Sequence, residues 1–293
     1  MLRALAAAVL LALSGPSWAL SPYIQGESLR PAATAKVAEE AAARLKAAGF
    51  QVLGQYFPRQ LPDYGVVVVA DEGLLNEIRA LGGATIVGAA IRVGVRADGG
   101  VIYMNPDYWY RAYFRGQFPK AEKTVRAVQE KLARALGAGL GVVGDVHPSV
   151  LPVYRYALGM ERFDSDNSRL AEQVSFDEAV RALRDNLDKE TAFTHKVYEV
   201  VMPDEKLAVF GVAMDDAARG DGAWLTKIGG QQSIAALPYE VFVVNTTVYA
   251  LYGRYRIALS FPDFGMAQFL RIVSTPEDIR EMLGAVAGAQ SRD

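Results

Sequence analysis

Apolar residues recur along the chain with a helical period in some segments and as extended runs in others. Val37, Ala41 and Leu45 share one face of a predicted helix. Two extended apolar runs follow, at residues 51–57 and 66–70. Because runs of this length and β-branched content are typical of strands, this segment predicts one helix followed by two strands.

The next segments predict a second helix, a hairpin and two more helices. A short helix over 71–83 is closed by a glycine pair. The turn at 96–100 contains an Asp-Gly pair, which is typical of a hairpin. The remaining elements are the strands 91–95 and 101–104 beside this turn, a helix that begins at Pro106 behind an Asn105 cap, and a helix over 119–136.

The second half of the chain predicts the same elements in the same order. Ser175 and Glu178 form a capping-box pattern ahead of an amphipathic helix. The later segments are strands at 196–202 and 207–214, a short helix over 220–230, strands at 241–250 and 255–259 around a turn at 252–254, and a helix from Thr275 to Val286.

A short motif relates the two halves. Pro106, Asp107 and Tyr108 match Pro262, Asp263 and Phe264 at a spacing of 156 residues. We therefore predict an α+β fold with two tandem repeats of an α-β-β-α-β-β-α unit, in which helices pack on antiparallel sheet. Asp107 and Asp263 are expected at equivalent helix starts. The predicted boundaries are residues 20–138 for the first repeat, 139–170 for a linker and 171–293 for the second repeat.

The N-terminal segment is typical of a cleavable signal peptide. Arg3 precedes an uncharged apolar run from Ala4 to Leu13, and small residues stand at Ser17 and Ala19. We predict a signal peptide over residues 1–19 with cleavage after Ala19, and a periplasmic or secreted protein. The apolar run is about half as long as a membrane-spanning helix, so we expect no membrane span after cleavage.

Composition and charge narrow the classes of protein. The chain has no cysteine, which excludes a lipid-anchored cysteine and structural disulfides. Its formal net charge is −2 and its basic residues form no block. Since proteins that bind nucleic acid usually present a concentrated basic surface, we predict no nucleic-acid partner.

One segment of the second half resembles a known bacterial family. Leu237-Pro238 precedes the valine-rich run 239–244, and residues 36–52 read as a helix, a Gly-Phe pair and a strand. These features are similar to the "domain of unknown function 302" family, here as two divergent copies. The resemblance implies a compact α+β unit and no agreed activity. Relatives often carry a cysteine and an asparagine after the leucine-proline pair, whereas Tyr239 and Glu240 stand there in this chain.

The densest cluster of candidate functional residues is the aromatic segment 103–118. One interpretation buries these rings in the core, behind a helix cap at Asn105. The other interpretation is an aromatic pocket between the two halves, in which acidic residues hold a ligand. The candidate pocket residues are Tyr103, Asp107, Tyr108, Trp109, Tyr113 and Asp263.

No catalytic or metal-binding motif has the context that its chemistry requires. His147 and His195 lack close ligand partners in the sequence, so no metal site and no cofactor are predicted. Gly139 to Gly144 match a dinucleotide motif but follow a helix instead of a strand. The leading hypothesis is a non-catalytic small-molecule binding or accessory protein. The alternatives are a periplasmic hydrolase that uses Asp, Glu and Tyr residues, and a haem or metal carrier; whether the chain is an enzyme and whether it has a protein partner stay open.

Overall fold

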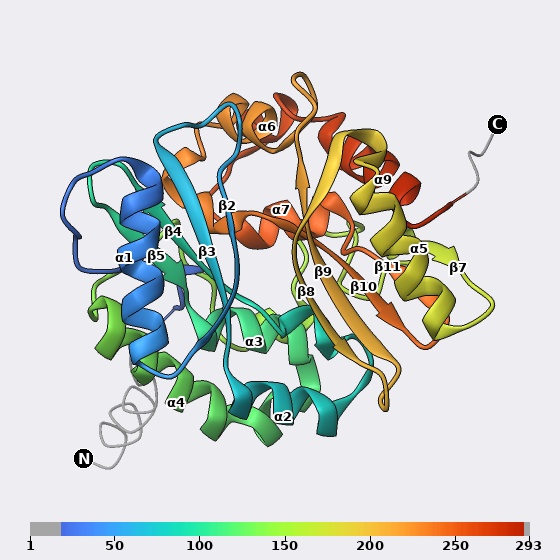
Figure 1. Ribbon diagram of the computed structural model, residues 1–293, viewed down its shortest axis with the longest axis horizontal. Helices are drawn as coiled ribbons and strands as arrows, with labels where there is room; N and C mark the ends of the chain where they lie inside the picture. Colours follow the sequence, from blue (N-terminus) through green and yellow to red (C-terminus); the bar gives the residue numbers. More distant parts are fainter. Residues whose placement is uncertain (1–18, 290–293) are drawn as a thin grey trace, which may run out of the picture.

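The computed structural model describes residues 19–289 as a mixed α/β protein with two antiparallel sheets. Figure 1 shows the sheets side by side, with helices along their outer faces and between them. The predicted signal peptide falls on residues outside the described range, apart from Ala19. Within residues 19–289, no helix combines the length and the apolar character that crossing a bilayer requires.

The first sheet has six strands in the order β2-β3-β4-β5-β1-β6. All of its neighbouring strands pair antiparallel. Its members are β1 (Tyr23–Gln25), β2 (Gln51–Tyr56), β3 (Tyr64–Ala70), β4 (Ile91–Arg96), β5 (Val101–Met104) and β6 (Gly141–Val142). The valines of β3 are fully buried because helices cover one face of this sheet and the second half of the chain covers part of the other.

Four α-helices belong to the first half. The Asp71 side chain accepts the backbone N–H of Leu74 and so caps the second of them. The third begins at Pro106, a residue that suits the first turn because it has no N–H to leave unpaired. The helices are α1 (Thr34–Ala47), α2 (Glu72–Leu81), α3 (Pro106–Phe114) and α4 (Phe118–Leu136), with the 3-10 helix η1 (Gly83–Gly88) after α2.

The second sheet has five strands in the order β7-β11-β10-β9-β8. Its members are β7 (Arg169–Glu172), β8 (Thr194–Met202), β9 (Leu207–Met214), β10 (Tyr239–Val244) and β11 (Thr247–Tyr249). Every residue of β9 is buried, which explains why its sequence reads as a continuous apolar run. The Leu237-Pro238 peptide bond directly before β10 is cis.

Five α-helices belong to the second half. The Ser175 side chain accepts the backbone N–H of Glu178 at the start of the first of them, as the capping pattern predicts. The helices are α5 (Phe176–Asp188), α6 (Asp221–Lys227), α7 (Gly253–Ser260), α8 (Met266–Leu270) and α9 (Thr275–Val286), with the 3-10 helix η6 (Gln231–Ala236) after α6. Two further short 3-10 helices, η3 (Leu151–Val153) and η4 (Asp166–Ser168), lie between the two sheets in sequence.

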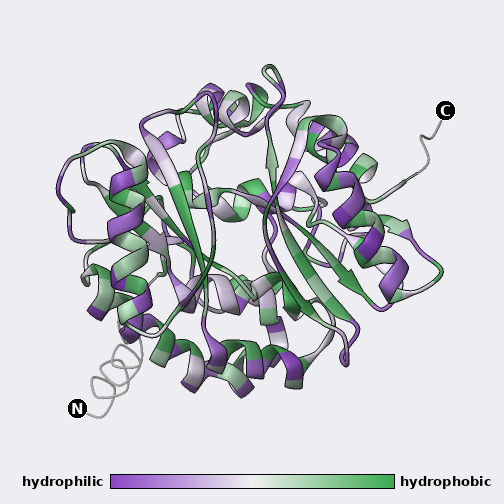
Figure 2. Ribbon diagram, in the orientation of Figure 1, coloured by the Kyte–Doolittle hydropathy of each residue, from purple (hydrophilic) through white to green (hydrophobic). Residues whose placement is uncertain are grey.

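The two halves contact each other reciprocally. The edge strands β2 and β8 lie together, and η1 contacts β9 and β10 while η6 contacts β3, β4 and β5. Gly54 of β2 faces the backbone carbonyl of Val197 so closely that any side chain at position 54 would overlap it. Figure 2 shows hydrophobic strands in both sheets and hydrophilic outer surfaces on α1, α2, α4 and α5. The buried apolar residues of both halves form one continuous core.

Two predicted elements of the second half differ from the structure. Residues 255–259, expected as a strand, belong to the helix α7, and residues 241–250 are divided between β10 and β11. Nearly every residue of α7 is buried, so its apolar residues surround the helix and leave no amphipathic period. The predicted linker, residues 139–170, contains the 3-10 helix η3.

The expected equivalence of Asp107 and Asp263 is wrong. Asp107 is the second residue of α3, whereas Asp263 lies in the turn between α7 and α8. The helix that follows the hairpin of the second sheet is α7, and its N-cap is Tyr252. A spacing of 156 residues therefore aligns the start of α3 with the end of α7.

Candidate functional site

Three charged side chains are buried together where the two halves meet. Arg92 comes from β4, Glu240 from β10 and Arg256 from α7, and none is more than 2% exposed. Arg92 Nη1 forms an ion pair with Glu240 Oε1, and Arg256 Nε lies 3.2 Å from Glu240 Oε2. We call these three residues the charged triad. Charges removed from water to this extent persist only when they are paired and hydrogen-bonded.

Backbone carbonyls of η6 and a serine complete the pairing of the guanidinium groups. Arg92 Nε donates to the carbonyl of Ala235 at 2.9 Å. Arg256 Nη2 donates to the carbonyl of Ala236 at 2.9 Å, and its Nη1 donates to Ser260 Oγ. Because η6 belongs to the second half, its carbonyl groups hold Arg92 of the first half beside Glu240 of the second half.

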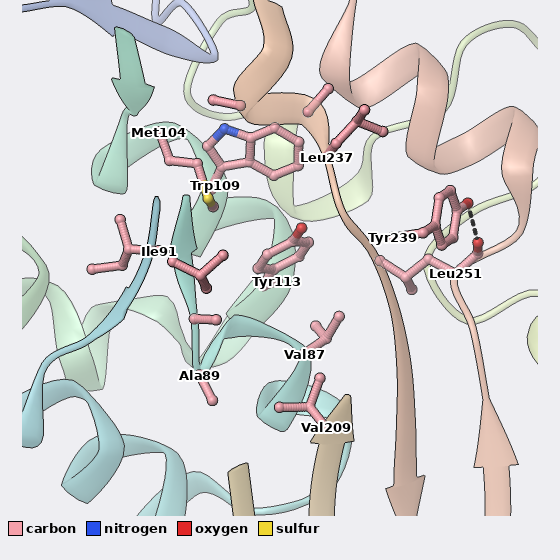
Figure 3. Close-up of a cluster of buried hydrophobic side chains, with 14 of the residues drawn as sticks. Val87, Ala89, Ile91, Met104, Trp109, Tyr113, Val209, Leu237, Tyr239 and Leu251 are labelled. Atoms are coloured by element: carbon pink, nitrogen blue, oxygen red, sulfur yellow. Dashed lines mark hydrogen bonds between the residues drawn. The ribbon is translucent and has the colours of Figure 1, made fainter. Parts of the chain in front are cut away.

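Trp109 forms the aromatic wall of the charged triad. The guanidinium carbons of Arg92 and Arg256 lie 5.1 Å and 4.9 Å from its ring centroid, within the range of cation–π attraction. Its indole Nε1 donates to the carbonyl of Pro22 at 2.7 Å, which fixes the ring on α3. Figure 3 shows Trp109 and Tyr113 of the first half to the left of Leu237 and Tyr239 of the second half.

Six buried side-chain polar atoms lack a hydrogen-bond partner among residues 19–289, and four of them lie around the charged triad. These four are the hydroxyls of Tyr23, Tyr113 and Tyr198 and the Nη2 atom of Arg92; the other two are Asn105 Oδ1 and Glu161 Oε2. The three tyrosines are at most 2% exposed. Tyr23 lies beside Ser260, but its hydroxyl does not reach the geometry of a hydrogen bond. Unpaired polar atoms at such burial are rare in folded proteins, so their concentration at one place indicates a site.

The tyrosines come from three different elements. Tyr23 lies on β1, Tyr113 on α3 and Tyr198 on β8, so both halves contribute. The ring of Tyr198 lies directly over Gly211 of β9, where any Cβ would overlap its ring carbons. Because Gly211 has no side chain, the ring of Tyr198 can pack directly against the backbone of β9.

The charged triad carries one positive charge in excess, because two guanidinium groups face one carboxylate. Burial lowers the pKa of Arg92, and the charge of Arg256 lowers it further. Arginine nevertheless stays protonated in proteins. Burial raises the pKa of Tyr23 to about 12, although both arginines oppose that shift. The hydroxyl of Tyr23 is therefore a neutral donor beside an excess of positive charge.

The predicted pocket residues are divided among several environments. Trp109 and Tyr113 belong to the buried site. The ring of Tyr108 packs edge-on against that of Trp109 at 5.7 Å between centroids, and its hydroxyl donates to the carbonyl of Leu259 at 2.8 Å. Tyr103 is buried elsewhere, and its hydroxyl donates to the carbonyl of Gly137 at 2.9 Å.

The two acidic members of the predicted pocket do not meet in it. Asp107 forms an ion pair of 2.9 Å with Arg111 on the same helix. Asp263 is exposed and lies against the backbone of Gly144. The structure therefore brings together three of the six predicted residues, Tyr108, Trp109 and Tyr113, and places no acidic residue of that set with them.

A second polar cluster lies where the end of β2 meets the start of α6. The Asp221 carboxylate is fully buried and accepts from Tyr56 Oη at 2.9 Å and from the backbone N–H of Met214 at 3.0 Å. Burial raises the pKa of Asp221 to about 7. The neighbouring Asp215 forms an ion pair with His195 Nδ1 at 3.0 Å. This arrangement pairs a carboxylate with an imidazole, and among residues 19–289 no serine, threonine or lysine side chain forms a hydrogen bond to either of them.

An open cavity of about 280 Å³ borders the buried site on the side of η3. Arg115 and Arg162 are among its lining residues, and Phe163 and Tyr255 are two more. The ring centroid of Phe163 lies 6.4 Å from that of Tyr113 and 6.0 Å from that of Tyr255. Phe163 therefore lines this cavity and also packs against the ring of Tyr113.

The two histidines show no metal-binding geometry. Nδ1 of His147 lies 2.6 Å from Ser149 Oγ, and His195 pairs with Asp215 as described above. Over the described range, no group of three His, Cys, Asp or Glu side chains is placed to hold a metal ion.

Comparisons with protein-family models, with curated proteins and with solved structures found no match to this chain. The resemblance to the family named above therefore stays a prediction. The function is therefore inferred from the geometry of the chain itself.

Sequence reasoning did not select the charged triad. Arg92 and Glu240 each interrupt an apolar strand, as Ile91-Arg92-Val93 and Tyr239-Glu240-Val241. A single charge of each sign within two buried strands is a signal of a buried ion pair, since such charges need partners. Arg256 interrupts an apolar segment in the same way, as Tyr255-Arg256-Ile257, but this segment is the helix α7 instead of the expected strand.

Proposed function

We propose that this chain is an exported, non-catalytic protein that binds a small molecule at the charged triad. The single observation that carries this proposal is the set of four unpaired buried polar atoms around Arg92, Glu240 and Arg256. A buried polar group without a partner costs roughly 1–3 kcal/mol, so an apo protein that keeps four of them together gives up stability. A bound polar molecule would remove that cost.

The proposed site lies between two copies of one unit. The strand orders β2-β3-β4-β5-β1 and β8-β9-β10-β11-β7 follow the same course, and a helix and a 3-10 helix separate the second and third strands in each case. Arg92 and Glu240 are both second residues of their strands, β4 and β10. These correspondences support a tandem repeat, with a register that aligns α3 with α7.

Binding is favoured over hydrolysis by the composition of the site. Glu240 is the one carboxylate of the charged triad. Because it already pairs with both arginines, it is not free to act as an acid or a base. A general acid and a general base need two groups whose environments separate their pKa values, and the charged triad supplies one carboxylate.

Native mass spectrometry of the purified chain tests the proposal. The protein is produced with its leader, taken from the exported fraction without dialysis, and weighed intact. A bound small molecule that is absent after substitution Arg92→Met is the expected result. Arg79→Met is the matched control, because Arg79 is exposed on α2 and forms only surface contacts. A mass equal to the bare chain in every preparation, with no tryptophan fluorescence response to a periplasmic extract, contradicts the proposal.

Export is tested on the same material. N-terminal sequencing of the exported protein is expected to begin at Leu20. Retention of the intact N-terminus in the cell interior contradicts the predicted localisation and leaves the binding site to be judged by itself.

A further inference from the structure

We infer that the ligand of the charged triad is a small monovalent anion, a carboxylate or a halide, held by Arg92 Nη2 and the hydroxyls of Tyr113 and Tyr198. This inference rests on the proposed function and adds the chemical class of the ligand. It follows from the kind of polar atoms that are unpaired, from the charge of the triad, and from the residues that line the way in.

All four unpaired atoms can donate. Arg92 Nη2 carries N–H groups and has no capacity to accept, whereas each tyrosine hydroxyl can donate one hydrogen and can also accept. Glu240, the carboxylate of the triad, already accepts from both guanidinium groups. A ligand that accepts could therefore pair with each of the four atoms. An anion supplies acceptors only, and a carboxylate offers about four lone-pair positions to neighbouring donors.

The charge of the site has the sign that an anion requires. Arg92 and Arg256 carry one positive charge more than Glu240 neutralises, in a place where water screens little. A monovalent anion would bring this buried region to neutrality. A divalent anion would reverse its sign, and a cation would add to an unpaired charge, so both are disfavoured by the same Coulomb argument.

The cavity beside the site is lined by arginine side chains, which would attract an anion before it reaches the charged triad. Arg115 and Arg162 lie at its surface, and the guanidinium carbon of Arg115 stands 4.6 Å from the ring centroid of Phe163. Arg115 also forms an ion pair of 3.2 Å with Asp164. Rotation of Phe163 would join this basic cavity to the hydroxyl of Tyr113, since the two rings are neighbours. The proposed route runs through side chains alone and needs no movement of either sheet.

Formate and formamide separate charge from shape. The two molecules have nearly the same size, but only formate is an anion. Thermal unfolding of the full mature chain is followed in halide-free zwitterionic buffer with increasing sodium formate, sodium chloride, sodium sulfate or formamide. Formate or chloride is expected to raise Tm in a saturable way, as mass action requires for binding to the folded state. Sulfate is expected to give no saturable shift of this kind, and formamide no increase in Tm.

Two tyrosine substitutions distinguish binding from a structural role. Tyr113→Phe and Tyr198→Phe each remove one unpaired hydroxyl and leave the ring. They are expected to raise Tm of the ligand-free protein by about 2–6 °C, because a buried group without a partner is deleted. The same variants are expected to weaken formate or chloride binding about ten- to hundred-fold, the effect of losing a hydrogen bond to a charged group.

Tyr110→Phe is the matched control. Tyr110 lies on the same helix and is equally buried, but its hydroxyl donates to the carbonyl of Gly88 at 2.8 Å. Its loss is expected to lower Tm and to leave anion binding unchanged. If Tyr113 has a purely structural role, Tyr113→Phe also leaves anion binding unchanged, as Tyr110→Phe does.

The outcomes separate this inference from the proposed function. A saturable Tm increase with formate or chloride that Arg92→Met abolishes supports both. A co-purified neutral molecule that Arg92→Met removes, together with no response to formate or chloride, overturns the anion and leaves the binding function standing. Anion stabilisation that survives Arg92→Met, Tyr113→Phe and Tyr198→Phe overturns the assignment to the charged triad. No co-purified molecule and no anion response overturns both.

Discussion

Replacement of Asp221 by asparagine is expected to change how the stability of this protein depends on pH. Burial raises the pKa of this carboxyl to about 7, while hydrogen bonds from the Met214 N–H, Tyr56 and Trp224 oppose the shift and Asp215 adds to it. In the unfolded chain an aspartate has a pKa of about 3.9. The folded protein therefore binds this proton more tightly than the unfolded chain does.

The sign and size of the effect follow from linkage. Between about pH 4 and pH 7 the folded state holds a proton that the unfolded state has released, so the free energy of unfolding falls as pH rises through this window. A shift of about three pKa units corresponds to roughly 4 kcal/mol, an order-of-magnitude figure for a fully buried group. Above about pH 8 both states are deprotonated, and the contribution of Asp221 no longer changes.

The measurement compares wild type with Asp221→Asn by urea unfolding, followed through tryptophan fluorescence, from pH 4.5 to pH 8.5. The other carboxylates titrate in both proteins and largely cancel in the difference. The wild-type free energy of unfolding minus that of the variant is expected to fall by up to about 4 kcal/mol over this range. A difference that is constant, or that rises with pH, would refute the assignment of a raised pKa to Asp221.

Three further substitutions have defined outcomes. The added methyl group in Gly211→Ala would overlap the ring of Tyr198. Chemical denaturation is expected to show a loss of about 1–3 kcal/mol in the free energy of unfolding, and an unchanged midpoint would contradict this. Ser175→Ala removes the side-chain oxygen that accepts the Glu178 N–H at 3.1 Å. Differential scanning calorimetry should show a loss of about 1 kcal/mol in the free energy of unfolding, and no change would mean that the cap is not formed. Glu240→Gln leaves two buried guanidinium groups without their carboxylate; a loss of about 3–5 kcal/mol is expected in urea unfolding, and a neutral effect would show that the arginines reach water.

Local signals in the sequence located most of the elements. The α5 cap at Ser175, the Pro106 start of α3 and the Asp-Gly turn after β4 lie where the pattern places them, because each depends on a few adjacent residues. The three short strands β1, β6 and β7 were missed. Each has four residues or fewer and gains its stability from pairing with a distant strand, and such pairing leaves no period in the sequence.

The candidate site was harder to predict because its residues meet only in the folded chain. The aromatic segment contains Trp109 and Tyr113, which lie beside the charged triad, but it offered Asp107 and Asp263 as the polar groups. The groups that do meet Trp109 come from strands and a helix of both halves. Periodicity assigns residues to a face of an element, and it does not say which faces will oppose one another.

The charged triad also bears on why the two halves differ. Under the proposed repeat, Arg92 and Glu240 occupy equivalent places, and each lies against the other across the boundary between the halves. Two identical copies would set arginine against arginine or glutamate against glutamate at this place, buried and without a partner, which is strongly unfavourable. The ion pair therefore requires that the copies differ, and a fused chain allows each copy to keep its own residue. Trp109 facing Arg256 on α3 and α7 follows the same logic, since the aromatic ring and the cation are attracted only when the two helices are not alike. A site built in this way exists once in the molecule, at the boundary, and its single excess positive charge arises from the same asymmetry.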